Sequence, residues 1–213
     1  MWEYVVDRRD EILFLSYQHV SLVLQCILLA TAIALLIAVF VYRSRRMTEA
    51  ANSVSAIGLT IPSFAFLGIL LTVTGFGITT SVIALTFYGA LPILRNAVVG
   101  LAGVDRTAVE SARGIGMSRI ATLLRVELPL AWPVILAGIR VSTQMTMGVA
   151  AIAAYVLGPG LGSLIFAGLS RLGGAGAVYS TLTGTIVVVL LALVVDVLLV
   201  LVGRLTTSKG IRV

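Results

Sequence analysis

The sequence contains five long stretches of mostly apolar residues, and they limit the possible fold more than any other feature. A helix that crosses a bilayer needs about 20 such residues, and its backbone polar groups must be bonded within the chain. The chain is 59% hydrophobic and 11% charged, whereas a soluble domain is about 25% charged. We therefore predict an all-α polytopic membrane protein with about five transmembrane helices. The expected spans are 20–42, 54–73, 78–101, 132–157 and 179–202.

Arginine and lysine are distributed unevenly among the segments that flank these spans. Most of them follow the first span, separate the third from the fourth, or follow the fifth. With an odd number of spans, these three segments fall on the same side, and an excess of basic residues marks cytoplasmic loops. The sequence thus predicts a multi-pass protein of the cell (inner or plasma) membrane, with its N-terminus outside and its C-terminus in the cytoplasm.

The spans divide the chain into three regions. Residues 1–19 mix acidic and basic side chains, lack a cleavage site for a signal peptide, and are expected to lie at the outer interface. Residues 20–203 form the transmembrane domain, and residues 204–213 form a basic cytoplasmic tail. The extracellular loop 158–178 is rich in glycine at both ends, and we expect its apolar middle to form a short helix on the outer surface.

Residues 105–129 are a charged segment in the middle of an otherwise apolar chain. Apolar residues recur there at spacings of three to five, which predicts a helix over 106–124 whose start is capped by the Asp105 carboxylate. Gly114 and Gly116 each weaken a helix by roughly 1 kcal/mol relative to alanine, so we expect a bend or a close backbone approach. Such a helix either lies solvated on the surface or inserts into a groove of a soluble partner.

The order of residues in this segment resembles the cytoplasmic signature of permease subunits of binding-protein-dependent ABC importers. That signature is Glu-Ala-Ala, three residues, glycine, nine residues, and Ile-x-Leu-Pro. From Glu110 to Pro129 this chain reads ESA, three residues, G, nine residues, and VELP, so the spacing is the same and two positions differ. The resemblance implies a type I importer permease fold with a cytoplasmic coupling helix that docks into a cleft of the ATPase. The coupling residues that it implies are Glu110, Ser111, Ala112, Gly116 and Pro129.

Four further stretches resemble the osmoprotectant branch of this family, which imports glycine betaine, carnitine, choline or proline betaine. They are TIPSFAFLG (60–68), LPILRNAVVGL (91–101), GPGLGSLIFAGL (158–169) and TSKGI (207–211). Pro159 is a departure, because the family tends to have glycine there. The resemblance implies three protein partners: a cytoplasmic ABC ATPase, an extracellular or periplasmic substrate-binding protein, and a second permease chain, identical or homologous. It implies no contact with nucleic acid.

The chain lacks the residues of several kinds of site. It has no Gly-x-x-x-x-Gly-Lys-Ser/Thr loop, so we expect no enzyme activity and no cofactor, with ATP used by the partner ATPase. With His19 as its single histidine, the sequence predicts no ordinary zinc site. A quaternary ammonium ligand favours an aromatic cage, but the aromatic residues are scattered along the sequence, and only the fold could gather them. We therefore expect the binding protein to supply most of the selectivity.

The polar residues inside the spans are the candidates for a translocation path or gate. Arg140, Thr143 and Gln144 lie in the first half of the fourth span, where polar groups face either a cavity or a neighbouring helix. Pro62 should kink the second span, either as architecture or as a hinge between inward and outward states.

Asp196 lies in the fifth span, about two turns from its expected cytoplasmic end. A buried carboxylate requires a cation, and both Arg95 and Arg140 lie at a similar depth. We predict a structural ion pair of Asp196 with Arg95, with Arg140 as the other natural partner, and a proton relay as the alternative.

Three other functions are compatible with parts of this pattern. A methionine or other amino-acid ABC permease can have a similar length and five spans. A stand-alone channel or proton-coupled carrier would show inverted repeats or several intramembrane acids, and this sequence has only Asp196. A membrane-bound assembly subunit would leave the spaced pattern from Glu110 to Pro129 without a role.

Overall fold

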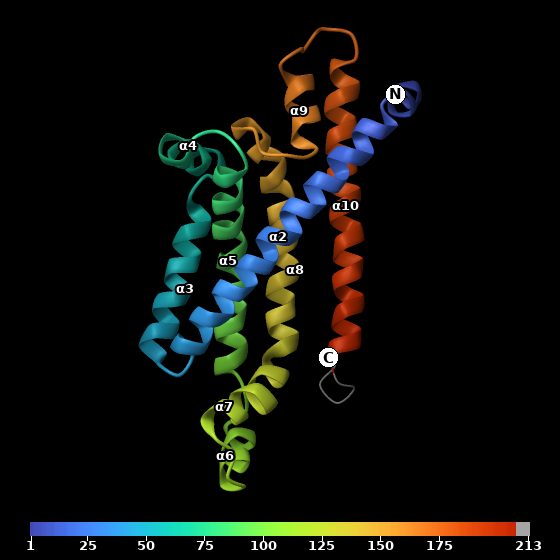
Figure 1. The fold of residues 1–213 in the computed structure, drawn as a ribbon. Helices are drawn as coiled ribbons and strands as arrows, with labels where there is room; N and C mark the ends of the chain where they lie inside the picture. The colour runs from blue at the N-terminus through green and yellow to red at the C-terminus, as the bar shows by residue number, and fades with distance from the viewer. Residues whose placement is uncertain (208–213) are drawn as a thin grey trace.

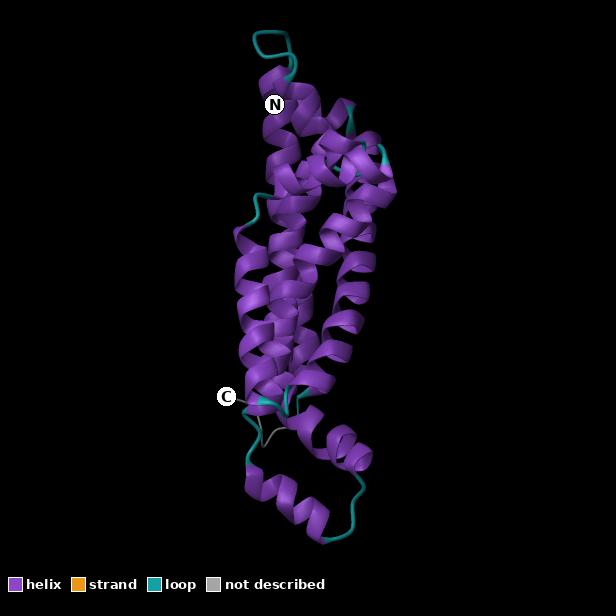
Figure 2. Cartoon of the chain, turned by 90° about the vertical axis from the view of Figure 1, so that its left-hand side faces the viewer, coloured by secondary structure: helices purple, strands orange, loops and turns teal. Residues whose placement is uncertain are grey.

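The computed structural model describes residues 1–207, and within them the chain is mostly helical, with short connections and no strand. Figure 2 shows these helices packed into an elongated bundle with a helical segment projecting beyond one end. Four helices are long and apolar enough to cross a membrane in one piece. They are α2 (Arg9–Val41), α5 (Ile78–Ala102), α8 (Leu128–Ala153) and α10 (Ala177–Thr206).

The fifth expected span is a bent pair of helices, α3 (Arg45–Thr60) and α4 (Ser63–Thr74), whose axes differ by 91°. The expectation of about five spans is therefore confirmed when this pair counts as one. The remaining helices are short: α1 (Trp2–Asp7), α6 (Arg106–Gly114), α7 (Arg119–Thr122), the π-helix η1 (Leu123–Glu127), the 3-10 helix η2 (Ala154–Val156) and α9 (Gly162–Leu169).

The bundle has two distinct ends. Figure 1 shows α6 and α7 projecting at one end, here called the α6 end, and α4, α9 and the N-terminus at the opposite end, here called the α9 end. The short helix expected in the loop 158–178 is α9. The first span is longer than expected, because α2 begins at Arg9 and the expected start at Val20 falls inside it. The tail expected at 204–213 lies mostly outside the described residues.

The break between α3 and α4 has a local cause in the sequence. Ile61 precedes Pro62 and is extended, with ψ of 123°, because a residue before proline is displaced from helical geometry. The Ile61 carbonyl then has no partner in its own helix, and the Tyr88 hydroxyl of α5 donates to it at 2.7 Å. Pro62 therefore does more than kink a span: it ends one helix and turns the next by about a right angle.

Helix α5 is the centre of the core and packs against α2, α3, α4 and α8. Small residues bring these helices close together: a Cβ atom on Gly138 of α8 would lie 2.6 Å from the Asn96 Cβ of α5. Nearby, the Ser142 hydroxyl donates to the Gly89 carbonyl at 2.6 Å. Packing of this kind holds helices together in lipid, where burial of apolar surface gives no net gain.

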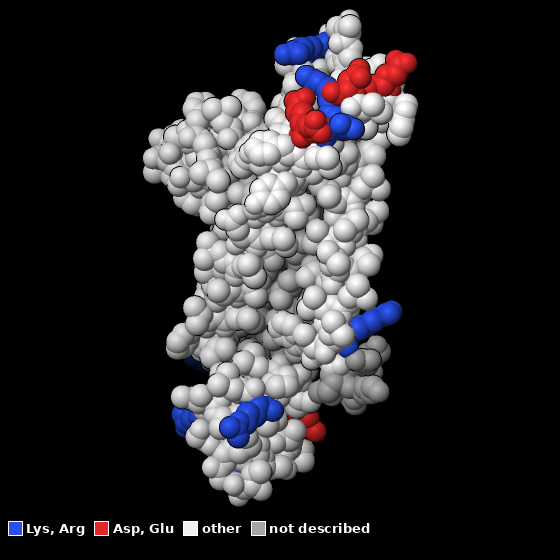
Figure 3. Space-filling view, turned by 45° about the vertical axis from the view of Figure 1, so that its right-hand side comes forward, with Lys and Arg blue, Asp and Glu red and all other residues white. Residues whose placement is uncertain are grey.

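Large apolar side chains cover much of the outside of α2 and α10. On the face drawn in Figure 3, most charged side chains lie toward the two ends and an uncharged band lies between them. An apolar exterior this extensive requires hydrocarbon or another apolar surface to cover it. The band therefore has the character expected of a membrane-spanning bundle.

Candidate functional site

The charged segment between α5 and α8 is the first candidate site, and the structure divides it into two helices. Asp105 caps α6 as predicted, its carboxylate accepting the Thr107 amide at 2.9 Å. The expected single helix over 106–124 is wrong, because α6 ends at Gly114 and α7 begins only at Arg119. The break coincides with the glycine pair, where a bend was expected.

Gly116 is the residue that terminates α6. Its φ is +88°, a left-handed conformation that strains any residue with a Cβ. The Gly116 amide donates to the Arg113 carbonyl at 2.9 Å, and the Met117 amide donates to the Ala112 carbonyl at 3.1 Å. This pair of bonds is a Schellman motif, which satisfies the last carbonyls of a helix and reverses the chain.

The second half of the segment is continuous with the bundle. Ser118 caps α7 through a bond from the Ala121 amide at 3.2 Å, and from there a helix of 38 residues runs through η1 and α8 to Val156. Pro129 is the second residue of α8, which begins where the wide π turn ends. Proline lacks an amide hydrogen and crowds the carbonyl four residues earlier, so an altered helical turn at this position is expected.

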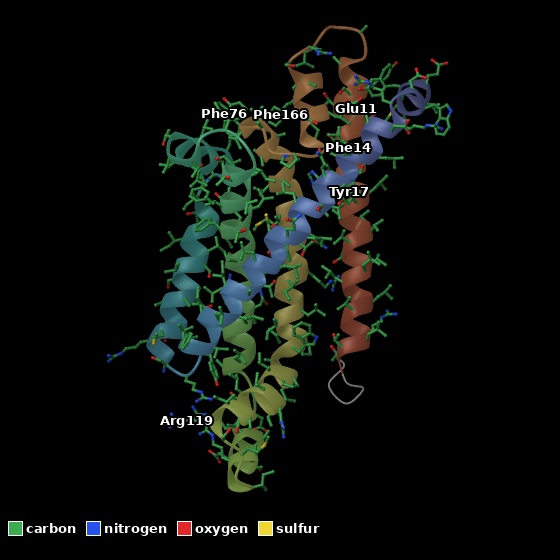
Figure 4. The ribbon with its side chains drawn as sticks, in the orientation of Figure 1. Glu11, Phe14, Tyr17, Phe76, Arg119 and Phe166 are labelled. Carbon is green, nitrogen blue, oxygen red and sulfur yellow. The ribbon has the colours of Figure 1, made fainter. Side chains whose placement is uncertain are left out.

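Most of the residues predicted to couple the chain to a partner are accessible. Glu110 and Ser111 are exposed, whereas Ala112 is buried against the rest of the segment. The large apolar side chains of the segment are also exposed rather than packed; these are Ile115, Ile120 and Leu124. The segment thus presents apolar side chains and a carboxylate to the surroundings at the α6 end, where Figure 4 labels Arg119.

A buried carboxylate joins this segment to the end of α2. Glu127 is only 4% exposed, and the Tyr42 hydroxyl donates to it at 2.5 Å while the Arg43 guanidinium lies 3.4 Å away. The Arg43 Nε also donates to the Tyr42 oxygen at 2.6 Å. Burial, together with the bond to Glu127, raises the pKa of Tyr42, so the phenol stays protonated and donates.

The three residues Tyr42, Arg43 and Glu127, here called the Glu127 cluster, were not expected to form a site. Glu127 occupies a freely variable position of the signature, and Tyr42 and Arg43 lie at the far end of another span. A glutamate between apolar residues was the only signal in the sequence. A cavity of about 330 Å³ separates the cluster from Arg106, Glu110 and Arg113 of α6.

The intramembrane acid is paired with an arginine of α8. Both Asp196 oxygens accept from Arg140, from Nε and Nη2, each at 2.9 Å. This bidentate geometry is the strongest form of an arginine–carboxylate contact. Of the two arginines expected as partners, Arg140 is the one that pairs. The pair with Arg95 does not form, because α10 packs against α8, α9 and α2 rather than against α5. Arg95 is exposed and has no ion pair within residues 1–207.

The other candidate path residues of α8 are on different faces. Gln144 is exposed and lines a groove of about 290 Å³ between α8 and α10. Thr143 is buried, and its hydroxyl donates to the Ile139 carbonyl of its own helix at 2.8 Å. Within one chain, Arg140 and Gln144 are therefore accessible from outside the bundle, and Thr143 is a core residue.

Residues 30–208 match the model of a protein family described as "Binding-protein-dependent transport system inner membrane component". The chain belongs to this family of ABC importer permeases, which agrees with its fold and with the Glu110–Pro129 signature.

Characterised relatives cover almost the whole chain. The choline transport system permease protein OpuBB of Bacillus subtilis is 36% identical over 99% of this chain and 95% of its own length. The glycine betaine/carnitine/choline permease OpuCB of the same organism is 34% identical, over 100% and 96%. The osmoprotectant import permease OsmW of Salmonella typhimurium is 34% identical, over 98% of each chain.

Among solved structures, the fold is similar to a chain of the MetNI methionine ABC transporter in an inward-facing conformation. The TM-score is 0.79 at 18% identity, and the alignment covers 92% of this chain and 96% of the other. The identity is low, so this likeness describes the fold alone.

Proposed function

We propose that this chain is the membrane-spanning subunit of an ABC importer whose cargo is a quaternary ammonium osmoprotectant such as choline, carnitine or glycine betaine. The observation that carries the proposal is the identity of 34–36% to permeases of that cargo class, over nearly the full length of both chains. The permease does no bond chemistry. It provides a path, and ATP hydrolysis occurs in a separate ATPase.

The α6 end is the cytoplasmic end in this proposal, and α6 and α7 are the docking site for the ATPase. Exposed Ile115 and Ile120 beside exposed Glu110 suit insertion into a groove of a soluble protein. The α9 end is then extracellular and receives the substrate-binding protein. Because α7, η1 and α8 are one continuous helix, movement of the docked segment reaches the middle of the bundle directly.

A second permease chain, identical or homologous, completes the path. In a single chain, Arg140 and Gln144 of α8 are accessible, so a partner placed against this face would enclose them. Polar side chains in a spanning helix are retained where they face a cavity or a partner. Pro62 supplies the break that turns α4 across the α9 end, where it can take part in opening and closing the path.

Two alternatives are less well supported. A methionine permease would share the fold, as MetNI does, but the fold likeness is at 18% identity and the osmoprotectant relatives are at about twice that level. A proton-coupled carrier requires an acid that is free to exchange protons in the membrane. Asp196 instead accepts two hydrogen bonds from Arg140.

The proposed function predicts ATP-dependent uptake. The chain is assembled in proteoliposomes with its ATPase, binding protein and second permease chain, and radiolabelled choline, carnitine and glycine betaine are added outside. Accumulation of at least one of them is expected only when ATP is enclosed with the ATPase. Uptake that continues without the ATPase would support the carrier, and uptake of methionine alone would support the amino-acid alternative.

The docking role predicts that Gly116→Ala weakens ATPase binding and that Gly114→Ala does not. No atom lies within 4 Å of a Cβ at either position, so neither variant causes a clash within the chain. Only Gly116 has a positive φ, and alanine there costs roughly 1–2 kcal/mol. Gly114 is helical, and alanine there favours α6 by about 1 kcal/mol.

The measurement is the affinity of the purified permease for its ATPase. We expect a loss of about tenfold for Gly116→Ala and no loss for Gly114→Ala. Equal affinities for the two variants and the unchanged chain would contradict a docking role for the turn at Gly116.

A further inference from the structure

Three aromatic rings that are far apart in the sequence come together at the α9 end. Tyr155 of η2 lies between Phe64 of α4 and Phe166 of α9, with ring centroids 4.6 Å from Phe64 and 6.0 Å from Phe166. Figure 4 labels Phe166 at this end, together with Phe76 from the α4–α5 turn. The right-angled turn after Pro62 is what brings α4 across to η2. The rings of Phe64, Tyr155 and Phe166 are here called the aromatic cluster.

The cluster is open rather than part of the core. Phe64 is 49% exposed and Tyr155 is 51% exposed. A second group of rings, Phe66, Phe87 and Tyr88, differs in this respect: Tyr88 is buried and its hydroxyl is bonded to Ile61. That second group supports the break between α3 and α4. The aromatic cluster does not support a helix break in this way, since Phe64 and Tyr155 each expose about half their surface.

No cation in residues 1–207 lies over the faces of the cluster. In residues 1–207, the arginines placed over rings are Arg8 over Tyr4 and Arg43 over Tyr42, and neither belongs to the cluster. The Tyr155 hydroxyl also has no hydrogen-bond partner within that part of the chain. A ring attracts a cation within about 6 Å of its centroid. The centroids of Phe64 and Tyr155 are 4.6 Å apart, so a cation over the exposed face of Tyr155 is also close to the Phe64 ring.

The backbone holds the cluster in place. The Gly77 amide donates to the Val156 carbonyl at 2.8 Å, which fixes the α4–α5 turn against η2. Leu157, two residues after Tyr155, has φ of +61°, a conformation that is unfavourable for leucine and is retained where the surroundings enforce it.

The rings come from three elements, α4, η2 and α9, so a relative movement of these elements changes the spacing between rings.

We propose that the aromatic cluster is a low-affinity site for the quaternary ammonium group of the cargo at the α9 mouth of the permease. This inference rests on the proposed function, whose cargo class has such a group. A trimethylammonium group has no N–H to donate, and an aromatic face attracts a cation without accepting such a bond. Partly exposed rings bind a cation weakly, and weak binding suits a site that passes its ligand onward.

The test measures binding to the permease alone, so it does not depend on uptake. The full chain is placed in nanodiscs, and saturation transfer from protein protons to the methyl protons of choline is recorded by NMR, with empty nanodiscs as the blank. Transfer is expected for the unchanged chain and for Tyr155→Phe, which keeps the ring. Tyr155→Leu and Phe64→Leu are expected to reduce it about two- to fivefold.

Two controls separate this site from an interfacial aromatic anchor. Phe76→Leu removes a ring that is 66% exposed at the same end and has no ring contact in residues 1–207, and it should leave the transfer unchanged. 3,3-Dimethylbutanol, the uncharged carbon isostere of choline, should give a much smaller signal. Equal signals for choline and the isostere, or equal losses for Phe76→Leu and Tyr155→Leu, would overturn the proposal. Absence of ATP-dependent uptake by the unchanged complex would instead count against the proposed function.

Discussion

Replacing Asp196 with leucine is expected to lower the stability of the folded chain by about 3 kcal/mol. The change leaves the Arg140 guanidinium without the carboxylate that accepts two of its hydrogen bonds. An unpaired arginine within a spanning helix costs up to roughly 3 kcal/mol on insertion scales. The measurement is the midpoint of thermal unfolding in detergent. Unfolding is monitored as the fraction of folded protein that size-exclusion chromatography recovers after heating.

The double variant Arg140→Leu/Asp196→Leu separates loss of the pair from loss of a side chain. It removes both charges and should recover most of the stability, because a paired charge replaced by apolar side chains is often neutral. Arg95→Leu is the matched control, since Arg95 is exposed and has no ion pair in residues 1–207. A single Asp196 variant as stable as Arg95→Leu would show that the pair contributes nothing.

Glu127→Ala is the second change with a large expected effect. It removes the acceptor of the Tyr42 hydroxyl and the partner of Arg43, and hydrogen bonds to a charged group contribute roughly 1.5–3 kcal/mol. We expect a stability loss of about 2 kcal/mol, since Arg43 is partly exposed and water can reach it. Hydrogen exchange should also become faster at the amides of η1, because the end of α2 no longer holds this turn.

Two variants at the same end calibrate this result. Tyr42→Phe removes the bond that Tyr42 donates to Glu127 and the bond that it accepts from Arg43. It leaves Arg43 beside the carboxylate, so about half the loss is expected. Glu49→Ala removes a glutamate whose pair with Arg45 is exposed, and surface pairs of this kind contribute at most about 1 kcal/mol. If Glu127→Ala destabilises no more than Glu49→Ala, the Glu127 cluster does not join α2 to α8.

The spans and the capped start of α6 could be predicted because each depends on local residues. An apolar run of about 20 residues has few folds available to it in a membrane, and Asp105 caps the helix that directly follows it. The glycine pair likewise predicted a bend in the helix. The structure shows its form, a positive φ at Gly116 and a Schellman motif.

The contacts between spans could not be predicted in this way. Arg95 and Arg140 have similar depths, and only the packing of α10 against α8 rather than α5 makes Arg140 the partner of Asp196. Glu127 and Tyr42 are 85 positions apart, and their contact depends on where α2 ends relative to η1. The aromatic residues seemed scattered because the turn that unites Phe64 with Tyr155 is a property of three elements together.

One continuous helix runs from Arg119 to Val156 and connects the two ends of the bundle. With 38 residues and a rise of 1.5 Å each, it is about 57 Å long. A tilt of about 5° around one end therefore displaces the other end by roughly 5 Å, the length of one helical turn. Tyr155 lies at one tip and the exposed Ile120 at the other. If the helix moves as one body, a small rotation at the α6 end therefore changes the distance between Tyr155 and its neighbouring rings at the α9 end.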